Sequence, residues 1–576
     1  MSGDKLDRRD IIGLAALGAA ALGATPSLAA TAPTAGKKAG KAKAAAAIPG
    51  ATMHGPGVPE VTKVVQTRSG PVQGLVIEGV NHFKGIRYGK APIGKLRFMP
   101  PQPVESWTAI YDATDFGAPA MQLASGTTVD TTNDFGMQMH RVFTTPSDIK
   151  IQNEDCLFLN VWTPAPDTKK RPVMVWIHGG GFAYGSGSQP IYQGDGLARF
   201  GDVVVVSLNH RLNVFGYLNL AEAMGPDYAS SGTVGMQDLV LALQWVRDNA
   251  AAFGGDPDNV MIMGQSGGGQ KVSILCAMPS AKGLFHKAAI QSGPGLAVGR
   301  PGPAAAGAKR LLDALGVKPG DRAALEAIPA ETIVAAAAKL GGGAGGGGAG
   351  GGPILDGVAI TRDPFTPDAP SVSADVPILV GWAKDEWTIF TAGEPWFGKL
   401  TEAELQARVK PMGAGGAKLL AAIRKAYPDY SPTYLWVQMI SVRVMQGSET
   451  LAERKAAEGR APAYVYMTSW ETPASGGVFK TPHTMEIPFM LYNFDRVRAF
   501  VGPGPQPKHM ADQIAGAWVA FARTGKPDHA GIPHWPAYNA QTRPVMDFNL
   551  KSRVVNDPLP QVREALNGLA APPPRR

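Results

Sequence analysis

The chain has 576 residues, of which 44% are hydrophobic and 18% are charged. This composition is typical of a globular protein with a large core. The formal net charge is +8, but the basic residues are scattered and no DNA-binding motif or zinc-type Cys/His cluster is present, which argues against a nucleic-acid-binding protein.

The first 29 residues have the features of a signal peptide. Arg8 and Arg9 precede an apolar stretch, Ile11–Ala24, and a small-x-small cleavage pattern (Ser-Leu-Ala) follows at residues 27–29. The apolar stretch is too short to form a stable membrane-spanning helix. The paired arginines favour the twin-arginine route, although an unstructured start or an uncleaved anchor is the alternative. We therefore expect an exported protein, periplasmic or secreted, without a stable membrane span after the signal is removed.

Residues 30–60 are rich in Ala, Gly, Lys and Pro and have no core-forming pattern, which predicts a flexible linker. Beyond it, short continuous apolar runs predict strands that are buried on both faces. These runs are Val173–Ile177, Asp202–Leu208, Val260–Met263 and Val376–Trp382. An apolar helical pattern lies between the second and third runs and ends at a Gly-Gly-Asp-Pro sequence. A strand, a helix and a further strand form a crossover unit, so we expect a parallel sheet.

Glycine clusters follow two of the predicted strands. The sequence WIHGGGF spans Trp176–Phe182, and the backbone N–H groups of its consecutive glycines can approach an oxyanion without obstruction by side chains. The sequence GQSGG places Ser266 directly after the run Val260–Met263 and before a predicted helix. A nucleophile at a sharp strand-to-helix turn needs strained backbone angles and small neighbours, so Ser266 is a candidate nucleophile.

A further glycine-rich stretch, Gly341–Gly352, contains too many glycines for a packed element. Strand-like runs lie on both sides of this stretch. We therefore interpret it as a surface loop within one catalytic domain that spans residues 61–570, rather than as a linker between domains.

These motifs resemble those of the type-B carboxylesterase family, which also contains the cholinesterases. Matching stretches cover nearly all of residues 71–547 and include FKGIRYGKAPIGKLRF, EDCLFLNVW, WIHGGGF, SLNHRLNVFGYL, AAIQSG, HTMEIPF and WVAFARTGKP. The resemblance implies an α/β-hydrolase fold with a large, mostly parallel central β-sheet flanked by helices. It also implies a serine esterase that needs no metal or cofactor.

The resemblance assigns roles to individual residues. It implies a triad of Ser266 as nucleophile, Glu386 as acid and His483 as general base, in the chain order of this fold. It further implies an oxyanion hole formed by the N–H groups of Gly180, Gly181 and Gly267, a supporting role for Ser292, and a structural salt bridge between Arg97 and Glu154.

The residue types alone leave the base and the acid open. His483, His509, His529 and His534 all follow Glu386 and could act as the base, and Asp385 competes with Glu386 as the acid. His483 lies on a loop after a predicted strand, which suits a base that must reach a serine hydroxyl. The family register selects Glu386 and His483. His178, which precedes the glycine cluster, is interpreted as structural.

The chain departs from the family at several positions. Gln265 replaces the usual glutamate before the nucleophile, Gly267 replaces an alanine after it, and Trp387 replaces a frequent glycine. Ala120 and Met121 stand where a cysteine partner of Cys156 is expected, so we expect Cys156 to be unpaired unless Cys276 lies close.

The departures also bear on the substrate. Residues 123–150 lack a tryptophan, which, with Gln265, argues against choline esters. Phe182, Tyr184, Gln265 and Trp387 are candidate pocket residues, although aromatic side chains at these positions could equally belong to the core.

We expect a serine carboxylesterase that acts on small-molecule esters. A binding protein on the same fold is one alternative, and a hydrolase of amides, carbamates or polymer esters is another. The sequence does not reveal the acyl or alcohol preference or the oligomeric state.

Overall fold

A computed structural model describes residues 59–122, 152–341 and 350–569 of the chain. The expected signal peptide, most of the expected linker, and residues 342–349 of the glycine-rich stretch lie outside the described residues.

Most of the strands belong to one large sheet. The strands are β1 (Glu60–Val61), β2 (Val65–Gln66), β3 (Pro71–Gln73), β4 (Leu75–Ile77), β5 (Val80–Arg87), β6 (Tyr111–Asp112), β7 (Phe158–Thr163), β8 (Arg171–Ile177), β9 (Val204–Leu208), β10 (Gly255–Gln265), β11 (Lys287–Gln291), β12 (Ile378–Ala383), β13 (Ala463–Thr468), β14 (Pro544–Phe548) and β15 (Arg553–Asn556).

The α-helices are α4 (Asp195–Gly201), α5 (Asn213–Tyr217), α6 (Ala221–Met224), α7 (Val234–Asn249), α8 (Gly267–Leu275), α9 (Pro301–Leu315), α10 (Arg322–Ala327), α11 (Ala330–Lys339), α12 (Thr388–Thr391), α13 (Glu402–Val409), α14 (Gly413–Ala426), α15 (Pro432–Glu458), α16 (Ile487–Met490), α17 (Arg498–Val501), α18 (Gln506–Thr524) and α19 (Pro560–Asn567).

Short 3₁₀ turns join these elements: η1 (Gly94–Leu96), η2 (Pro190–Tyr192), η3 (Pro226–Tyr228), η4 (Ser231–Thr233), η5 (Ala250–Phe253), η6 (Pro279–Ala281), η7 (Ser371–Ser373), η8 (Lys410–Met412) and η9 (Ala474–Gly477).

Within the described residues the large sheet has 12 strands, in the order β1-β4-β5-β7-β9-β8-β10-β11-β12-β13-β14-β15. All neighbours from β9 to β14 run parallel, and the strands at both ends of the sheet are antiparallel. A small second sheet contains β2, β3 and β6. The expected mostly parallel sheet is confirmed.

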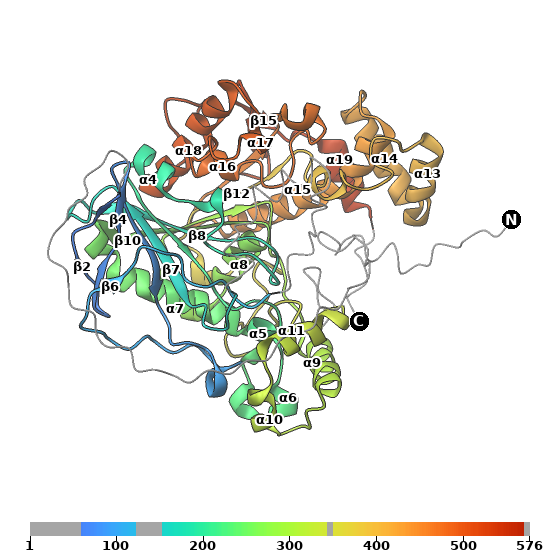
Figure 1. The fold of residues 1–576 in the computed structure, drawn as a ribbon. Coiled ribbons are helices and arrows are strands. Elements are labelled where there is room, and N and C mark those ends of the chain that lie inside the picture. Colours follow the sequence, from blue (N-terminus) through green and yellow to red (C-terminus); the bar gives the residue numbers. More distant parts are fainter. Residues whose placement is uncertain (1–58, 123–151, 342–349, 570–576) are drawn as a thin grey trace, which may run out of the picture.

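Alternate side chains of the central strands pack into different cores because successive residues of a strand point to opposite faces. Val173 and Val175 of β8 pack in the core that contains α7 and α8, whereas Met174 and Trp176 pack in the core that contains α16 and α18. The helices accordingly lie on both sides of the sheet (Figure 1). This two-sided burial explains why the central strands read as continuous apolar runs.

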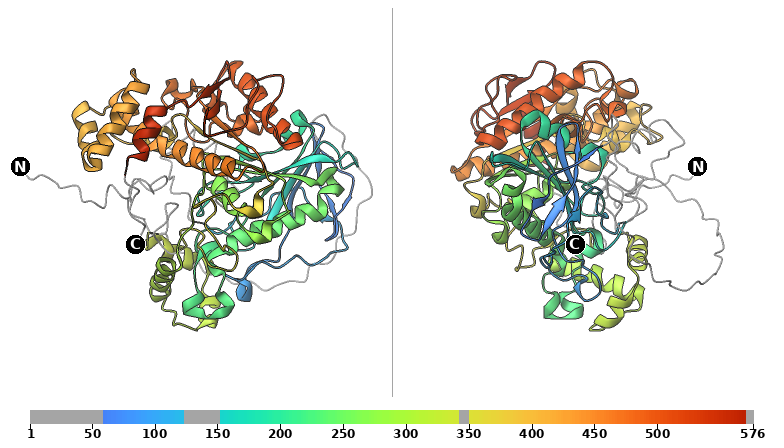
Figure 2. Two further views of the ribbon diagram at one scale, coloured as in Figure 1. Left: turned by 180° about the vertical axis from the view of Figure 1, so that it is seen from behind. Right: turned by 60° about the vertical axis from the view of Figure 1, so that its left-hand side comes forward.

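Helices α9, α10 and α11 pack with α5 and α6 around a third, smaller core. In Figure 1 helices α6, α9 and α10 lie below the sheet, whereas α13 and α14 lie above it at the right, and Figure 2 shows the same separation. No helix in the described ranges has the length and apolar character required to cross a membrane.

Candidate active site

Ser266 stands alone between β10 and α8, which gives a strand-to-helix turn of minimal length. Its backbone angles are φ 59° and ψ −126°, a strained conformation for a residue with a side chain. The N–H of Ser266 donates to the carbonyl of Gln291 on the neighbouring strand β11, at 2.8 Å. The side chain is half-buried. Strand pairing therefore maintains the strained turn that presents this hydroxyl.

Glu386 and His483 meet beside this turn. Oε2 of Glu386 is hydrogen-bonded to Nδ1 of His483, and Oε1 accepts from the backbone N–H of Ala383 at 2.8 Å. The two side chains are 1% and 7% exposed, so the pair is largely removed from water. The carboxylate fixes the ring so that Nδ1 carries the proton and Nε2 presents a lone pair.

The sheet topology brings these three residues to one edge. Ser266 follows β10, Glu386 follows β12 and His483 follows β13, and these strands are parallel members of one sheet. The carboxyl ends of parallel strands share an edge, where the loops of an α/β sheet form its binding site.

The other candidates for the acid and the base have different partners. Asp385 is fully buried and accepts from Tyr430 Oη and Gln438 Nε2, both at 2.8 Å. His509, His529 and His534 contact Leu550 O, Gln513 O and Asp528 Oδ1 respectively. Of these residues, the structure brings together Glu386 and His483.

Gln265 contacts the imidazole directly, which the sequence did not reveal. Its Nε2 lies 3.0 Å from Nε2 of His483. Because Nδ1 of the ring donates to Glu386, Nε2 must be the acceptor, and the Gln265 amide donates to it. The residue before the serine thus adjoins the nitrogen that a general base would use.

The glycine cluster after β8 forms a tight loop against the start of α8. Gly180 and Gly181 have φ values of 83° and 60°, in the left-handed region that favours glycine. A Cβ on Gly267 would lie 2.3 Å from the carbonyl oxygen of Gly181, so the two backbones are in direct contact. Two main-chain segments with little side-chain bulk therefore meet next to Ser266.

The structure also shows the surroundings of Ser292 and of the Arg97–Glu154 pair, which the family resemblance assigns to supporting roles. Ser292 is 5% exposed, its N–H donates to Gly381 O at 2.8 Å, and its hydroxyl has no partner among the described residues. Arg97 and Glu154 form a bidentate salt bridge, in which both N–O distances are 2.6 Å. Arg97 also donates to carbonyls of Leu325 and Ile328, so this pair anchors the α9–α11 region to the rest of the molecule.

Aromatic side chains border the site. The ring of Phe390 lies 5.2 Å from that of His483, and Trp387 packs edge-on against Phe390 at 5.3 Å. Phe182 packs edge-on against Tyr217 at 5.2 Å and is partly buried, as is Tyr184. Phe390 was missed in the sequence; it lies on α12, which begins two residues after Glu386, and an aromatic residue so close to the expected acid is the signal that would have found it.

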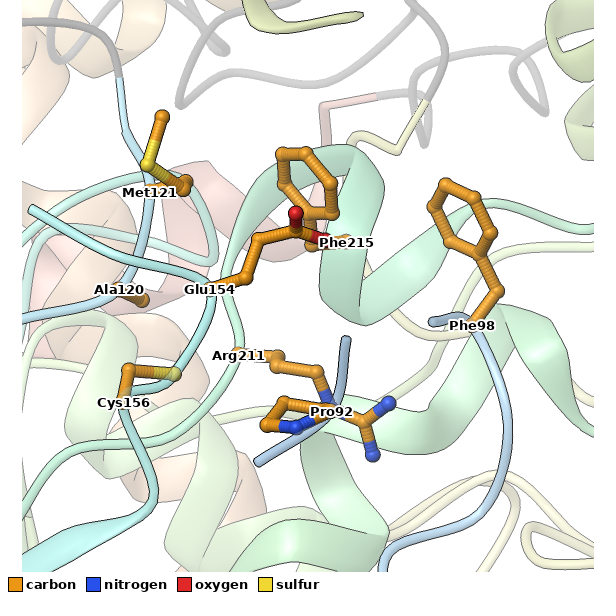
Figure 3. A pocket seen from close by; sticks show the side chains of 8 residues that line it. All are labelled: Pro92, Phe98, Ala120, Met121, Glu154, Cys156, Arg211 and Phe215. Atoms are coloured by element: carbon orange, nitrogen blue, oxygen red, sulfur yellow. The ribbon is translucent and has the colours of Figure 1, made fainter. Parts of the chain in front are cut away.

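Cys156 and Cys276 are both free and buried. Cys156 lines a small pocket together with Ala120, Met121, Glu154 and Arg211 (Figure 3). The pocket leaves about 10 Å³ for the centre of a water molecule, which is close to the minimum that a water requires. None of its lining residues belongs to the expected triad. Within the described residues, no cluster of three or more His, Cys, Asp or Glu is arranged to hold a metal ion.

Comparison with known proteins shows the family of the chain. The model of the carboxylesterase family matches residues 61–566. The para-nitrobenzyl esterase of Bacillus subtilis (strain 168) is 33% identical over 510 residues, covering 88% of this chain and 98% of that protein.

Solved structures are similar too. The carboxylesterase EST55 of Geobacillus stearothermophilus is 40% identical with a TM-score of 0.75, covering 88% of this chain and 100% of that chain. An esterase from the anaerobe Clostridium hathewayi, described as able to hydrolyse aliphatic aromatic polyesters, is 33% identical with a TM-score of 0.71, over 89% and 100% of the two chains.

The parallel sheet and the serine turn define an α/β-hydrolase. Within that class, the chain belongs to the carboxylesterase family. It is a carboxylic ester hydrolase.

Proposed function

We propose that the protein hydrolyses carboxylic esters through an acyl-enzyme formed on Ser266, with His483 as general base and Glu386 as the acid of the triad. The observation that carries this proposal is the buried contact between Glu386 and His483 at the sheet edge where Ser266 lies in its strained turn. A serine hydroxyl is a poor nucleophile unless an oriented base accepts its proton.

In the proposed reaction, Oγ of Ser266 attacks the ester carbonyl carbon while its proton passes to Nε2 of His483. The tetrahedral intermediate then collapses, the bond to the alcohol oxygen breaks, and the imidazolium returns the proton to the leaving alcohol. Water, deprotonated by the same nitrogen, attacks the acyl-enzyme and releases the acid. Glu386 holds the ring in its tautomer and stabilises its positive charge throughout.

The N–H groups of Gly180, Gly181 and Gly267 are assigned to the oxyanion. In support, the loop and the start of α8 are in backbone contact beside Ser266, and glycine removes side-chain bulk at that contact. Pre-positioned N–H donors stabilise the charge that develops on the carbonyl oxygen.

The substrates are small-molecule esters. Gln265 carries no charge where the family usually has a glutamate, which favours uncharged alcohol groups over choline. Phe182, Tyr184, Trp387 and Phe390 are assigned to the pocket, where aromatic side chains would pack against apolar acyl or alcohol groups. We also infer export of the protein, on the basis of the paired arginines and the apolar stretch at its start.

The central test is Ser266→Ala. We expect kcat for p-nitrophenyl butyrate to fall by at least about 10⁴-fold, with the far-UV circular dichroism spectrum unchanged. The control is Ser371→Ala, in an exposed turn away from the site, which should retain full turnover.

A fluorophosphonate probe gives an independent readout. The wild type should be labelled at Ser266 and the Ser266→Ala variant should not. Labelling that is absent from the wild type would favour a binding protein on the same fold, and undiminished turnover of Ser266→Ala would overturn the nucleophile assignment.

A further inference from the structure

Lys271 is a buried cation that the reaction above does not use. It lies on α8, one helical turn after Gly267, and its side chain is 0% exposed. Within the described ranges no acidic side chain forms an ion pair with it, and its one hydrogen bond goes to a backbone carbonyl. A buried ammonium without a counter-ion is costly, so its presence beside the nucleophile calls for an explanation.

Lys271 contacts the glycine loop, the loop after β8 that carries Gly180 and Gly181. Its Nζ donates to the carbonyl of His178 at 3.1 Å, two residues before Gly180. Nζ also lies 5.5 Å from the centre of the Phe182 ring, one residue after Gly181. Lys271 thus contacts the loop on both sides of the two glycines.

The same lysine belongs to the helix that carries the third proposed oxyanion donor. A Cβ on Gly268 would lie 2.1 Å from Ile177 O and 3.0 Å from His178 O, so the first turn of α8 packs directly on the start of the loop. The Lys271 side chain spans this contact. It therefore links the helix of Gly267 to the loop of Gly180 and Gly181.

The ionisable groups around Lys271 do not neutralise it. His178 and His210 stack with ring centres 4.9 Å apart, and both are fully buried. Burial, and then the charge of Lys271, lower the pKa of His178 to about 3 and that of His210 well below its ordinary value. Both imidazoles are therefore neutral near pH 7. Arg211 is paired with Asp238 on α7, with N–O distances of 2.6 and 2.9 Å.

We infer that Lys271 is a positioning residue for the oxyanion hole: its ammonium fixes the loop of Gly180 and Gly181 against α8 and adds positive charge behind the proposed oxyanion. This inference rests on the proposed triad and oxyanion hole. In a low-dielectric interior, a fixed charge near a developing negative charge acts strongly. Because Lys271 is 0% exposed, we expect its ammonium not to contact the substrate, so its effect should fall mainly on kcat.

If Lys271 has this role, its protonation should be visible in the pH dependence of turnover. Burial lowers the pKa of this ammonium from 10.5 to about 7. The positive charge is complete well below that value and is lost as the pH rises through it. Turnover of the wild type should therefore show an alkaline limb above pH 7 that belongs to Lys271.

The test replaces Lys271 by methionine, which has a similar unbranched shape without the charge. We expect kcat for p-nitrophenyl butyrate at pH 7 to fall about 10- to 100-fold, less than for a lost direct donor, while KM changes less than about twofold. Binding of a trifluoromethyl ketone, which forms an oxyanion with the serine, should weaken by the same factor as kcat/KM. The alkaline limb should disappear.

Two further variants sharpen the test. Lys271→Gln keeps a donor but not the charge, and it should also lack the alkaline limb. The control is Lys455→Met on α15, where a buried lysine likewise donates to backbone carbonyls, of Ser373 and Ala374, but also pairs with Glu458 at 2.7 Å; its kcat and pH profile should match the wild type.

The inference is overturned if Lys271→Met keeps the wild-type kcat, or if the wild-type limb persists in both Lys271 variants. Should neither variant fold, a wild-type profile that stays flat between pH 7 and 10 overturns it. Ser266→Ala, assayed in parallel, separates the two proposals. If Ser266→Ala is inactive and Lys271→Met is fully active, only the role of Lys271 is contradicted. If Ser266→Ala is active, the proposed triad is contradicted.

Discussion

At the scale of single residues, the side chain of Gln265 is hydrogen-bonded to Nε2 of His483, the nitrogen that accepts the Ser266 proton in the proposed mechanism. The amide of Gln265 lies 3.0 Å from Nε2 of His483 and donates to it. The amide must therefore release this lone pair before the base can act. A neutral donor at this position adds no second negative charge to the imidazole, which is already bonded to Glu386 through Nδ1, in contrast to the glutamate that the family usually carries there.

Gln265→Glu should alter the pH dependence of catalysis. A carboxylate close to Nε2 stabilises the protonated ring, because an opposite charge within about 4–6 Å favours the charged form. The protonated ring cannot act as a base, so the acid limb of the kcat/KM profile should move to higher pH by about one unit. A profile from pH 4 to 8 with p-nitrophenyl butyrate provides the measurement.

Gln265→Met, which matches the size of glutamine without its polar group, is the control and should leave the acid limb in place. An unmoved limb in Gln265→Glu would show that the carboxylate does not face the imidazole.

Some of the site residues could be predicted from the sequence, but the contacts between them could not. Ser266 was readable from its place directly after a predicted strand, whereas the family resemblance was needed to select Glu386 and His483. The contact of Gln265 with His483 joins residues 218 positions apart, and no local pattern encodes it. Lys271 carried a weak signal, a lone charge inside an apolar helix, whose meaning depends on what packs against it.

At the scale of elements, the catalytic geometry depends on how closely α8 approaches the glycine loop. Gly267, where the family usually has alanine, allows its backbone to touch that of Gly181, and an added Cβ would lie 2.3–2.5 Å from Gly181 backbone atoms. Real Cβ atoms do not approach so closely, so one of the two elements would have to move. The donors of the proposed oxyanion hole lie on both.

Gly267→Ala should therefore displace the loop and lower kcat by about 10- to 100-fold, because oxyanion donors act only when accurately placed. Kinetics with p-nitrophenyl butyrate and thermal unfolding measure the effect. Gly302→Ala is the matched control. Gly302 lies in α9, and a Cβ there would meet nothing within 4 Å. It should keep kcat unchanged and gain stability of up to about 1 kcal/mol. A wild-type kcat in Gly267→Ala would show that the loop can move to accommodate the Cβ without loss of activity.

The strand boundaries show how packing refines a sequence pattern. The run predicted from Asp202 begins as a strand at Val204, because Asp202 takes a left-handed conformation (φ 44°) that ends α4 and pairs with Arg171. The run predicted from Val260 begins earlier, at Gly255, where β10 pairs with Arg171 of β8 before an irregularity. Apolar periodicity located the buried centres of these strands, but the ends depend on polar partners in other segments.

At the scale of the whole molecule, buried charge far from the site should shape stability. Glu449 lies within α15, is 3% exposed, and its Oε2 has no hydrogen-bond partner among the described residues. Burial, and then the nearby charge of Asp557, raise the pKa of this carboxyl from 4.5 to about 7. The folded state thus holds a proton that the unfolded chain releases at much lower pH.

This difference fixes the sign of the pH dependence. Between pH 4.5 and 7 the folded protein binds the proton more tightly than the unfolded chain, so the contribution of Glu449 is complete below pH 4.5 and is lost as the pH rises to 7. Glu449→Gln replaces the acid by a neutral group of the same shape and should remove this loss. The variant should match the wild type at pH 4.5 and exceed it above pH 7 by at most about 3 kcal/mol in the free energy of unfolding.

Urea unfolding at several pH values from 4.5 to 8 measures the difference. Glu331→Gln, exposed on α11, removes the same charge without burial and should shift stability almost equally at every pH. A Glu449→Gln variant whose advantage does not grow with pH would mean that Glu449 ionises in the fold as readily as in the unfolded chain, with water or an arginine such as Arg543 reaching it. Glu449 lies about three helical turns along α15 from Gln438, the residue that donates to Asp385 next to the proposed acid. We therefore expect kcat to be unaffected, which separates the cost of this buried charge from that of Lys271.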